Sequence, residues 1–156
     1  MKVSAPFFVS YARRDAADVE RFRRVMLPLM KASAEFAVGE CIDRQILPGQ
    51  GWRAEIEAGL AGARFGLLLV SPEFLASDFI QEHEAPALLA KPVLVPVALH
   101  EVHFDGSMAL NGLHERQVFH DSRRRCFDAC RTGRDRRVFA RELFAGITAL
   151  LRGQAC

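Results

Sequence analysis

Two glutamates, Glu82 and Glu84, stand two positions apart in the stretch from 77 to 84. On a helix, side chains two positions apart point about 200° away from each other, so both cannot face one crevice. A single carboxylate held beside a reacting carbon can stabilise developing positive charge and hold a hydroxyl group. The usual position of a helical glutamate is the solvated surface, and that is the interpretation given to Glu82.

Other side chains suited to ligand binding stand near expected strand ends. They are Ser10, Arg13, Arg44, Trp52, Ser71 and Phe79. The arginines can contact phosphate groups, although a solvated loop position is the simpler interpretation of each. The tryptophan and the phenylalanine can stack on a ring, and the tryptophan suits a core position equally well. The two serines are expected at strand ends that face a crevice.

Two further groups of residues have simple interpretations. A conceivable zinc set comprises His114, His120, Cys126 and Cys130. Its spacing is not a common zinc pattern, so buried free thiols are expected and no metal site is predicted. Arginines also concentrate between positions 123 and 141. They indicate a solvated surface or a docking patch for an acidic partner or RNA, and no aromatic residues interleave there as a base-stacking surface requires.

The bulk properties suit one domain over residues 1–156. Half of the 156 residues are hydrophobic (50%), which supports a packed core, and the net charge is +2. So small a charge gives no argument for nucleic acid or a membrane. No apolar stretch approaches the roughly 18 to 20 residues needed to cross a bilayer, and no secretory signal is apparent. A cytoplasmic protein with reduced cysteines is therefore expected.

Strand and helix signals alternate along the first half of the chain. The apolar run over 7–11 predicts a buried strand, and 36–42 predicts a second strand that stops at Asp43. Asp15 is placed to cap a helix whose apolar residues recur at helical spacing. A short helix is expected over 52–60.

The alternation continues in the second half. Residues 65–70 are apolar at every position except Gly66, as in a central parallel strand covered on both faces. Ser71 followed by Pro72 is typical of a helix start, and that helix is expected to reach about Lys91. The remaining expected elements are a strand over 93–99 placed towards an edge by Pro96, a loop over 100–115, a short strand over 117–119 and a closing helix over 138–151.

These elements predict an α/β fold in which a parallel sheet of about five strands is flanked by helices on both faces. In such sheets ligands bind outside the carboxyl ends of the strands. The tips after Ser10, Ile42, Val70 and Leu99 should therefore surround one crevice. The topology by itself names no reaction.

Four segments in order resemble the TIR domain family in its bacterial form: residues 7–15, 42–52, 55–75 and 77–84. They carry an opening strand with a Ser-Tyr loop, a long loop containing Pro-Gly, a strand followed by Ser-Pro, and a helix motif with a glutamate. The resemblance implies a flavodoxin-like fold. Ile80 stands where many members have a cysteine, a departure that removes no group needed for the chemistry.

The resemblance implies an activity because catalytic members cleave NAD into nicotinamide and linear or cyclic ADP-ribose products. Their single glutamate corresponds to Glu84. The nicotinamide of NAD is a pyridinium and leaves as a neutral group, so no acid is needed to protonate it and one carboxylate suffices. NAD is then the substrate, and no further cofactor is expected. The implied substrate-binding residues are Ser10, Tyr11, Arg13, Asp43, Arg44, Trp52, Ser71 and Phe79.

Other members of the family are signalling adaptors that assemble through contacts between TIR domains. Here that contact would use the loop formed by Ile46, Leu47, Pro48 and Gly49. Members are commonly activated when copies stack, so an isolated monomer should show low activity in its role as an immune, anti-phage or cell-death effector.

A sensor is expected as a partner protein or as a fused domain, with no membrane contact and no direct contact with nucleic acid. A receiver domain is set aside because Ser10-Tyr11 occupies the place of the acid pair that holds magnesium. A nucleoside deoxyribosyltransferase, which has a similar fold and a glutamate, is a more remote alternative.

Overall fold

The computed structural model describes residues 2–38, 41–47, 51–77, 91–110 and 112–154. Four parallel strands form the main sheet in the order β4-β2-β5-β6, and β1 pairs with β3 in a separate two-stranded parallel sheet. The strands are β1 (Val3–Ser4), β2 (Phe7–Ala12), β3 (Phe36–Ala37), β4 (Cys41–Ile46), β5 (Phe65–Val70) and β6 (Leu94–Ala98). The predicted α/β fold with a parallel sheet is confirmed.

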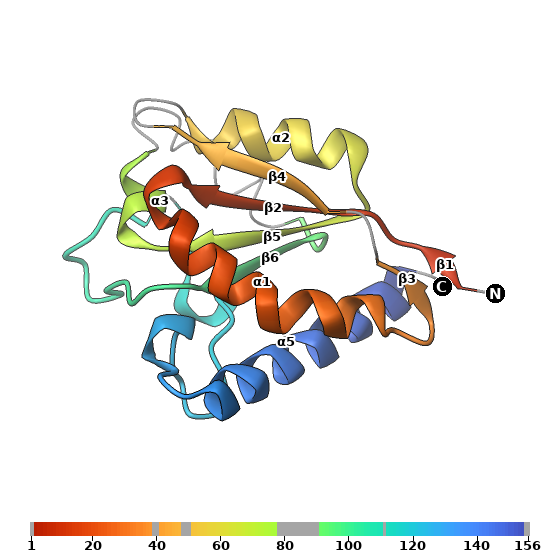
Figure 1. Ribbon diagram of the computed structural model, residues 1–156. Coiled ribbons are helices and arrows are strands. Elements are labelled where there is room, and N and C mark those ends of the chain that lie inside the picture. The colour runs from red at the N-terminus through yellow and green to blue at the C-terminus, as the bar shows by residue number, and fades with distance from the viewer. Residues whose placement is uncertain (1, 39–40, 48–50, 78–90, 111, 155–156) are drawn as a thin grey trace.

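Helices cover both faces of the main sheet. The helices are η1 (Arg13–Asp15), α1 (Ala16–Lys31), α2 (Trp52–Gly62), α3 (Pro72–Ala76), η2 (Glu115–Gln117), η3 (Phe127–Ala129) and α5 (Gly133–Gln154). Figure 1 shows α1 and α5 on one face and α2 on the other. No helix of the described residues combines the length and apolar character that a membrane span requires.

Strand residues alternate between two cores because successive side chains point to opposite faces of a sheet. Phe7, Val9 and Tyr11 of β2 pack with α1 and α5. Phe8 and Ala12 of the same strand pack on the side of α2. β5 lies between β2 and β6 and is buried at all six positions, so its predicted central place is confirmed.

The Phe8 ring occupies space left by two glycines. A Cβ atom added at Gly59 of α2 would lie 2.7 Å from the Phe8 ring, and one added at Gly66 of β5 would overlap that ring. The absence of a side chain at Gly66 therefore lets a large aromatic residue fill the core between β2, β5 and α2.

The predicted strand over 36–42 is divided in the structure. Its first part, β3, pairs with β1, and β4 joins the main sheet beside β2. The prediction that the strand stops at Asp43 is wrong, because pairing with β2 continues as far as Ile46. β4 lies at an edge of the sheet, where a strand does not need to be apolar at every position.

The helix expected after β5 begins as predicted and ends earlier. The Ser71 hydroxyl oxygen accepts a hydrogen bond of 3.0 Å from the Phe74 amide, which confirms the cap. α3 ends at Ala76, and the Ser77 hydroxyl donates a bond of 2.6 Å to the Phe74 carbonyl. A serine hydroxyl that bonds this carbonyl competes with the next helical turn. The predicted helix over 78–90 lies outside the described residues.

β6 lies at the other edge of the main sheet, where Pro96 was predicted to place it. The strand expected over 117–119 is reduced to one parallel bridge, between Val97 and Phe119. Two bonds make this bridge: the Phe119 amide donates to the Pro96 carbonyl at 2.7 Å, and the Ala98 amide donates to the Phe119 carbonyl at 2.9 Å. Proline has no N–H, so a neighbour can use its carbonyl but cannot continue a full ladder.

Candidate functional site

Two neighbouring strands carry buried polar atoms near their carboxyl ends. Ser10 of β2 lies opposite Arg44 of β4. The Ser10 side chain is fully buried, and neither its Oγ nor the Arg44 Nε has a hydrogen-bond partner in the described part of the chain. An unpaired buried polar group costs about 1–3 kcal/mol. Such groups therefore need an explanation, and a bound ligand is one.

Trp52 adds a third unpaired group on the same side of the sheet. It is the first residue of α2 and is fully buried in the core that contains Phe8. Its ring lies 5.6 Å from that of Phe74, and its indole Nε1 has no partner within the described ranges. The ring therefore packs in the core, and only its N–H group is left unsatisfied.

Tyr11 points to the opposite face from Ser10. It is buried in the core below α1 and α5, and the Arg23 guanidinium lies 5.4 Å from the centre of its ring. The structure thus brings Ser10, Arg44 and Trp52 to the α2 side of the sheet and places Tyr11 on the other side.

Asp15 and Ser71 meet where β2 and β5 end. Asp15 stands at the N-cap position of α1, as predicted, but its side chain makes no capping bond and instead accepts a hydrogen bond from the Ser71 hydroxyl. A bond across two strand ends replaces a local one because Asp15 is turned into the protein, where its side chain is buried. Burial raises the pKa of Asp15, because an apolar setting disfavours the charged form.

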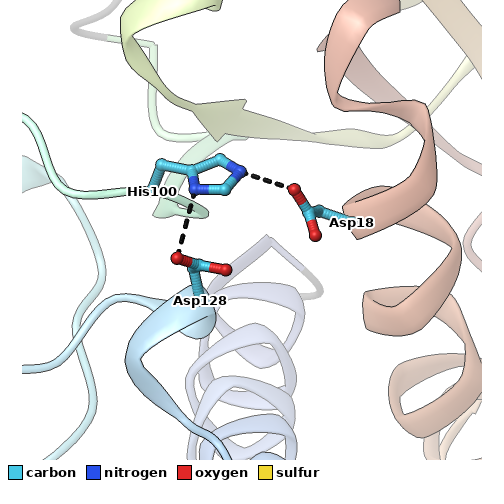
Figure 2. A group of neighbouring side chains, drawn as sticks. All are labelled: Asp18, His100 and Asp128. Atoms are coloured by element: carbon cyan, nitrogen blue, oxygen red, sulfur yellow. Dashed lines mark hydrogen bonds and ion pairs between the residues drawn. The ribbon is translucent and has the colours of Figure 1, made fainter.

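Figure 2 shows His100 between two carboxylates from different elements. Its Nε2 lies 2.7 Å from Asp18 Oδ2 in the first turn of α1, and its Nδ1 lies 3.5 Å from Asp128 Oδ2 in η3. Asp15 Oδ1 is 3.9 Å from Nε2. One imidazole therefore connects α1, the segment after β6 and η3.

Backbone bonds fix the position of His100. The amides of Leu99 and His100 both donate to the Val70 carbonyl, at 3.0 and 3.2 Å, and the Asp128 amide donates to the Leu99 carbonyl at 2.9 Å. The sequence predicts only a loop over 100–115, and it gives no local sign that His100 lies beside Asp18 and Asp128. His100 and Asp18 are 82 positions apart in the sequence. The one signal that could have linked them is that each follows the carboxyl end of an expected strand.

This cluster has the donor set of a cation site, since ligand atoms of Asp18, His100 and Asp128 lie within 4.8 Å of one another. Carboxylate and imidazole ligands suit several divalent metals. Both imidazole nitrogens already face a carboxylate, however, so a hydrogen bond to Asp18 and an ion-pair contact with Asp128 account for the arrangement. We interpret the cluster as a clamp that holds three elements together at the carboxyl edge of the sheet.

Several predicted residues lie elsewhere or beyond the described residues. Arg13 is exposed on η1, and Leu47 is 42% exposed directly after the buried Ile46. Outside the described residues lie Glu84, Phe79, Pro48, Gly49 and the side chain of Asp43.

The conceivable zinc set does not gather around one point in the described ranges. Cys126 and Cys130 are free and buried, as expected for structural thiols. Burial raises the pKa of Cys130 to about 11. The His120 Nδ1 instead lies 3.0 Å from the Val118 carbonyl oxygen.

Comparison with known families gives one match. A family model described as TIR domain matches residues 7–136, which is most of the chain. The matched stretch runs from β2 to the first turn of α5 and includes the strands of the main sheet. No curated protein matches the chain.

Proposed function

The chain belongs to the TIR domain family, and we propose that it cleaves the bond between nicotinamide and ribose in NAD, with Glu84 as its catalytic carboxylate. The family includes NAD-cleaving enzymes. The observation that carries the proposal is the group of unpaired buried polar atoms at Ser10, Arg44 and Trp52. They lie on one side of a parallel sheet, and two of them lie near the strand ends where such sheets bind ligands.

The proposed reaction needs one carboxylate and a water molecule. The bond from the ribose carbon to the nicotinamide nitrogen breaks, and its electron pair leaves with neutral nicotinamide. The Glu84 carboxylate stabilises the positive charge that develops on the ribose and holds a ribose hydroxyl. Water adds to the same carbon and releases a proton, which gives ADP-ribose. An internal nucleophile of the substrate in place of water gives a cyclic product.

The unpaired groups have roles that suit a dinucleotide. The Arg44 guanidinium offers N–H donors to a phosphate oxygen, and Ser10 offers a hydroxyl on the adjoining strand. In this proposal Asp43, Ser71 and Phe79 complete the binding of the ribose and the rings, and Arg13 meets a phosphate from η1. A ligand that pairs these atoms would remove the penalty of leaving them unsatisfied.

Nicotinamide release from NAD, followed by liquid chromatography, tests the proposal. Turnover should rise as the protein is concentrated or crowded, because members of the family are commonly activated by stacking. Glu84→Gln should lower kcat by about 100-fold or more. Glu82→Gln is the matched control and should retain turnover, since side chains two positions apart on a helix point about 200° away from each other and cannot both face the site. No turnover by assembled protein, or full turnover by Glu84→Gln, would contradict the proposal.

One observation favours a second candidate, an assembly module without enzymatic activity. TIR domains generally self-associate, and Leu47, which belongs to the predicted assembly loop, is one of two large hydrophobic residues exposed in the described residues. The partner would be another TIR domain, with a sensor as a partner protein or fused domain. Light scattering of Leu47→Glu tests this, with Val3→Glu as the control because Val3 is similarly exposed (45%). Lost association in Leu47→Glu alone, in a protein that never consumes NAD, selects the module.

A further inference from the structure

A groove lies between α1 and α5, two helices that lie side by side on the face opposite α2 (Figure 1). Its volume is about 940 Å³, within the range of roughly 300–1,000 Å³ typical of small-molecule sites. Its charged lining consists of Arg21, Arg24, Arg134, Arg136, Arg137 and Arg141. Its apolar lining includes Val25, Leu29 and Val138, and none of the described residues that line it carries a carboxylate.

The arginines gather in the groove because of their helical spacing. Arg134, Arg137 and Arg141 stand three and four positions apart, so they share one face of α5, and Arg21 and Arg24 do the same on α1. Gly133 brings the positive end of the α5 dipole to the same groove. The acid in that first turn, Asp135, is turned away to Arg125, with 3.4 Å between the charged atoms.

Most of these positive charges are not neutralised within the domain. Arg21 pairs with Asp18, and Arg136 donates to the Cys130 carbonyl at 3.1 Å. Across the described ranges, no carboxylate pairs with the guanidinium groups of Arg24, Arg134, Arg137 or Arg141. Four like charges around one groove repel each other, and an anion bound between them would remove that repulsion.

We propose that the α1–α5 groove binds a phosphate-bearing small molecule of nucleotide size. Guanidinium groups present planar pairs of donors that match phosphate oxygens, and every cation in the lining is an arginine. The apolar residues in its lining suit the base or sugar of a nucleotide. The site is distinct from Ser10, Arg44 and Trp52, which belong to the other face of the sheet, so it does not depend on the proposed NAD cleavage.

The charge of the groove also argues against a second copy of the chain as its occupant. A symmetric dimer places the same surface on both subunits, so this face would oppose arginine with arginine. An acidic peptide or a nucleic acid would satisfy the charge without requiring a groove of this limited volume. These two occupants are therefore separate arms of the test.

Isothermal titration with ATP and, separately, with pyrophosphate tests the proposal in low-salt buffer. The decisive variant is Arg134→Glu/Arg141→Glu. Both residues are exposed, and an acid in the first turn of a helix is favourable, so α5 should persist. The control is Arg116→Glu/Arg123→Glu, which changes the net charge equally at exposed positions outside the groove. Arg24→Gln removes one donor pair from the other helix and leaves α5 unaltered.

Wild type should bind each probe at one site, more weakly as salt is raised. The groove variant should lose roughly 100-fold in affinity and Arg24→Gln about tenfold, with little change in the control. Absence of saturable binding by both probes would overturn the proposal, as would equal losses in the groove variant and the control. Binding of polyglutamate or an oligonucleotide, without binding of ATP or pyrophosphate, would also overturn it.

Discussion

The two faces of the main sheet are filled in different ways, although the same strands supply both. Under α1 and α5, four phenylalanine rings make a connected series with centroid distances of 5.2–5.5 Å: Phe22 with Phe127, Phe127 with Phe139 and Phe139 with Phe119. In the same core, Phe7 stacks on Phe65 at 5.1 Å as a separate pair. On the α2 face, the Phe8 ring fits against two glycines, and Trp52 lies beside it in the same core with an unpaired N–H group.

This difference separates stability from ligand binding. The core beneath α1 and α5 consists of apolar contacts that need no further partner, whereas the charged groove lies outside it, between the two helices. The α2 face keeps Ser10, Arg44 and Trp52 with unpaired polar atoms in the described residues, at a cost in stability that the other face must offset. Of the two cores, the one beneath α1 and α5 is therefore filled by apolar packing, and the one beneath α2 contains the buried groups with unmet hydrogen-bonding capacity.

The largest expected effect comes from the aromatic series. Phe139→Ala removes a fully buried ring that contacts both Phe119 and Phe127, and should lower the free energy of unfolding by about 3–5 kcal/mol. Urea denaturation followed by circular dichroism measures this. Phe144→Ala, at a half-buried position on the same helix, is the control and should cost less. Equal losses of unfolding free energy in the two variants would mean that the contacts among the phenylalanine rings add no stability beyond that of an ordinary half-buried ring.

The second effect concerns the close contact between the Phe8 ring and Gly66 on the α2 face. Gly66→Ala introduces a Cβ that overlaps the Phe8 ring and should cost about 1–3 kcal/mol, because that ring is buried and cannot move away freely. Gly146→Ala is the matched control: a Cβ there meets no atom within 4 Å, so the change should stabilise α5 by up to about 1 kcal/mol. Thermal unfolding of both variants measures this. A loss of stability in Gly66→Ala but not in Gly146→Ala indicates close packing around Phe8, and no loss in either indicates loose packing there.

A second substitution sharpens that test. Phe8→Leu combined with Gly66→Ala should cost less than the sum of the two single changes, since the smaller side chain makes room for the new methyl group. Additive losses would show that Gly66 is needed for some reason other than the space occupied by Phe8.

The sequence predicts the strands and the order of elements well where periodicity is clear. The run at 65–70 is recognisable because a central strand is apolar throughout. The end of β4 is not recognisable from the sequence. Pairing with β2 extends the strand through Asp43 and Arg44, which are residue types that do not indicate a strand. The end of α3 is not recognisable either, because it coincides with a hydrogen bond from the Ser77 hydroxyl to the Phe74 carbonyl, and residue type alone does not predict that bond.

The site is predicted in part, for a similar reason. Strand-end residues such as Ser10 and Arg44 can be found by combining topology with residue type. The cluster of His100, Asp18 and Asp128 forms only when three separate elements pack together. No local sequence pattern indicates this cluster. Asp15 shows the limit most directly, because its position favours a helix cap and its actual partner, Ser71, lies 56 residues away.

A smaller effect is expected from Asp15, where the strand ends meet. Burial raises its pKa above the ordinary value of 3.8, so the folded protein binds this proton more tightly than the unfolded chain. Its contribution to stability is therefore present at low pH and is lost as pH rises through the raised pKa. Asp15→Asn, which keeps an acceptor for Ser71, should gain stability relative to wild type as pH rises across that window.

The matched comparison for Asp15 is Asp105, an exposed carboxylate whose pKa is lowered by hydrogen bonds from Ser107. Its contribution is present above the ordinary pKa and is lost as pH falls, so Asp105→Asn should shift the pH profile in the opposite direction. Urea denaturation at a series of pH values measures both. Profiles of the same sign would show that burial does not govern the titration of Asp15.

The smallest expected effect leaves stability unchanged and compares the two cores through their cysteines. Cys126 belongs to the α2-side core and Cys130 to the α1–α5 core. Burial raises the pKa of both thiols, and that of Cys130 to about 11 from 9.0, so the reactive thiolate of Cys130 should be roughly 100-fold scarcer at neutral pH than that of a thiol with the ordinary pKa. Cys126 is also 9% exposed, whereas Cys130 is fully buried, so iodoacetamide, followed by peptide mass mapping, should label Cys126 before Cys130 in folded protein and both equally in urea. Since labelling also requires local opening, faster reaction at Cys130 would mean that the α1–α5 face opens more readily, contrary to the division between a packed face and a binding face.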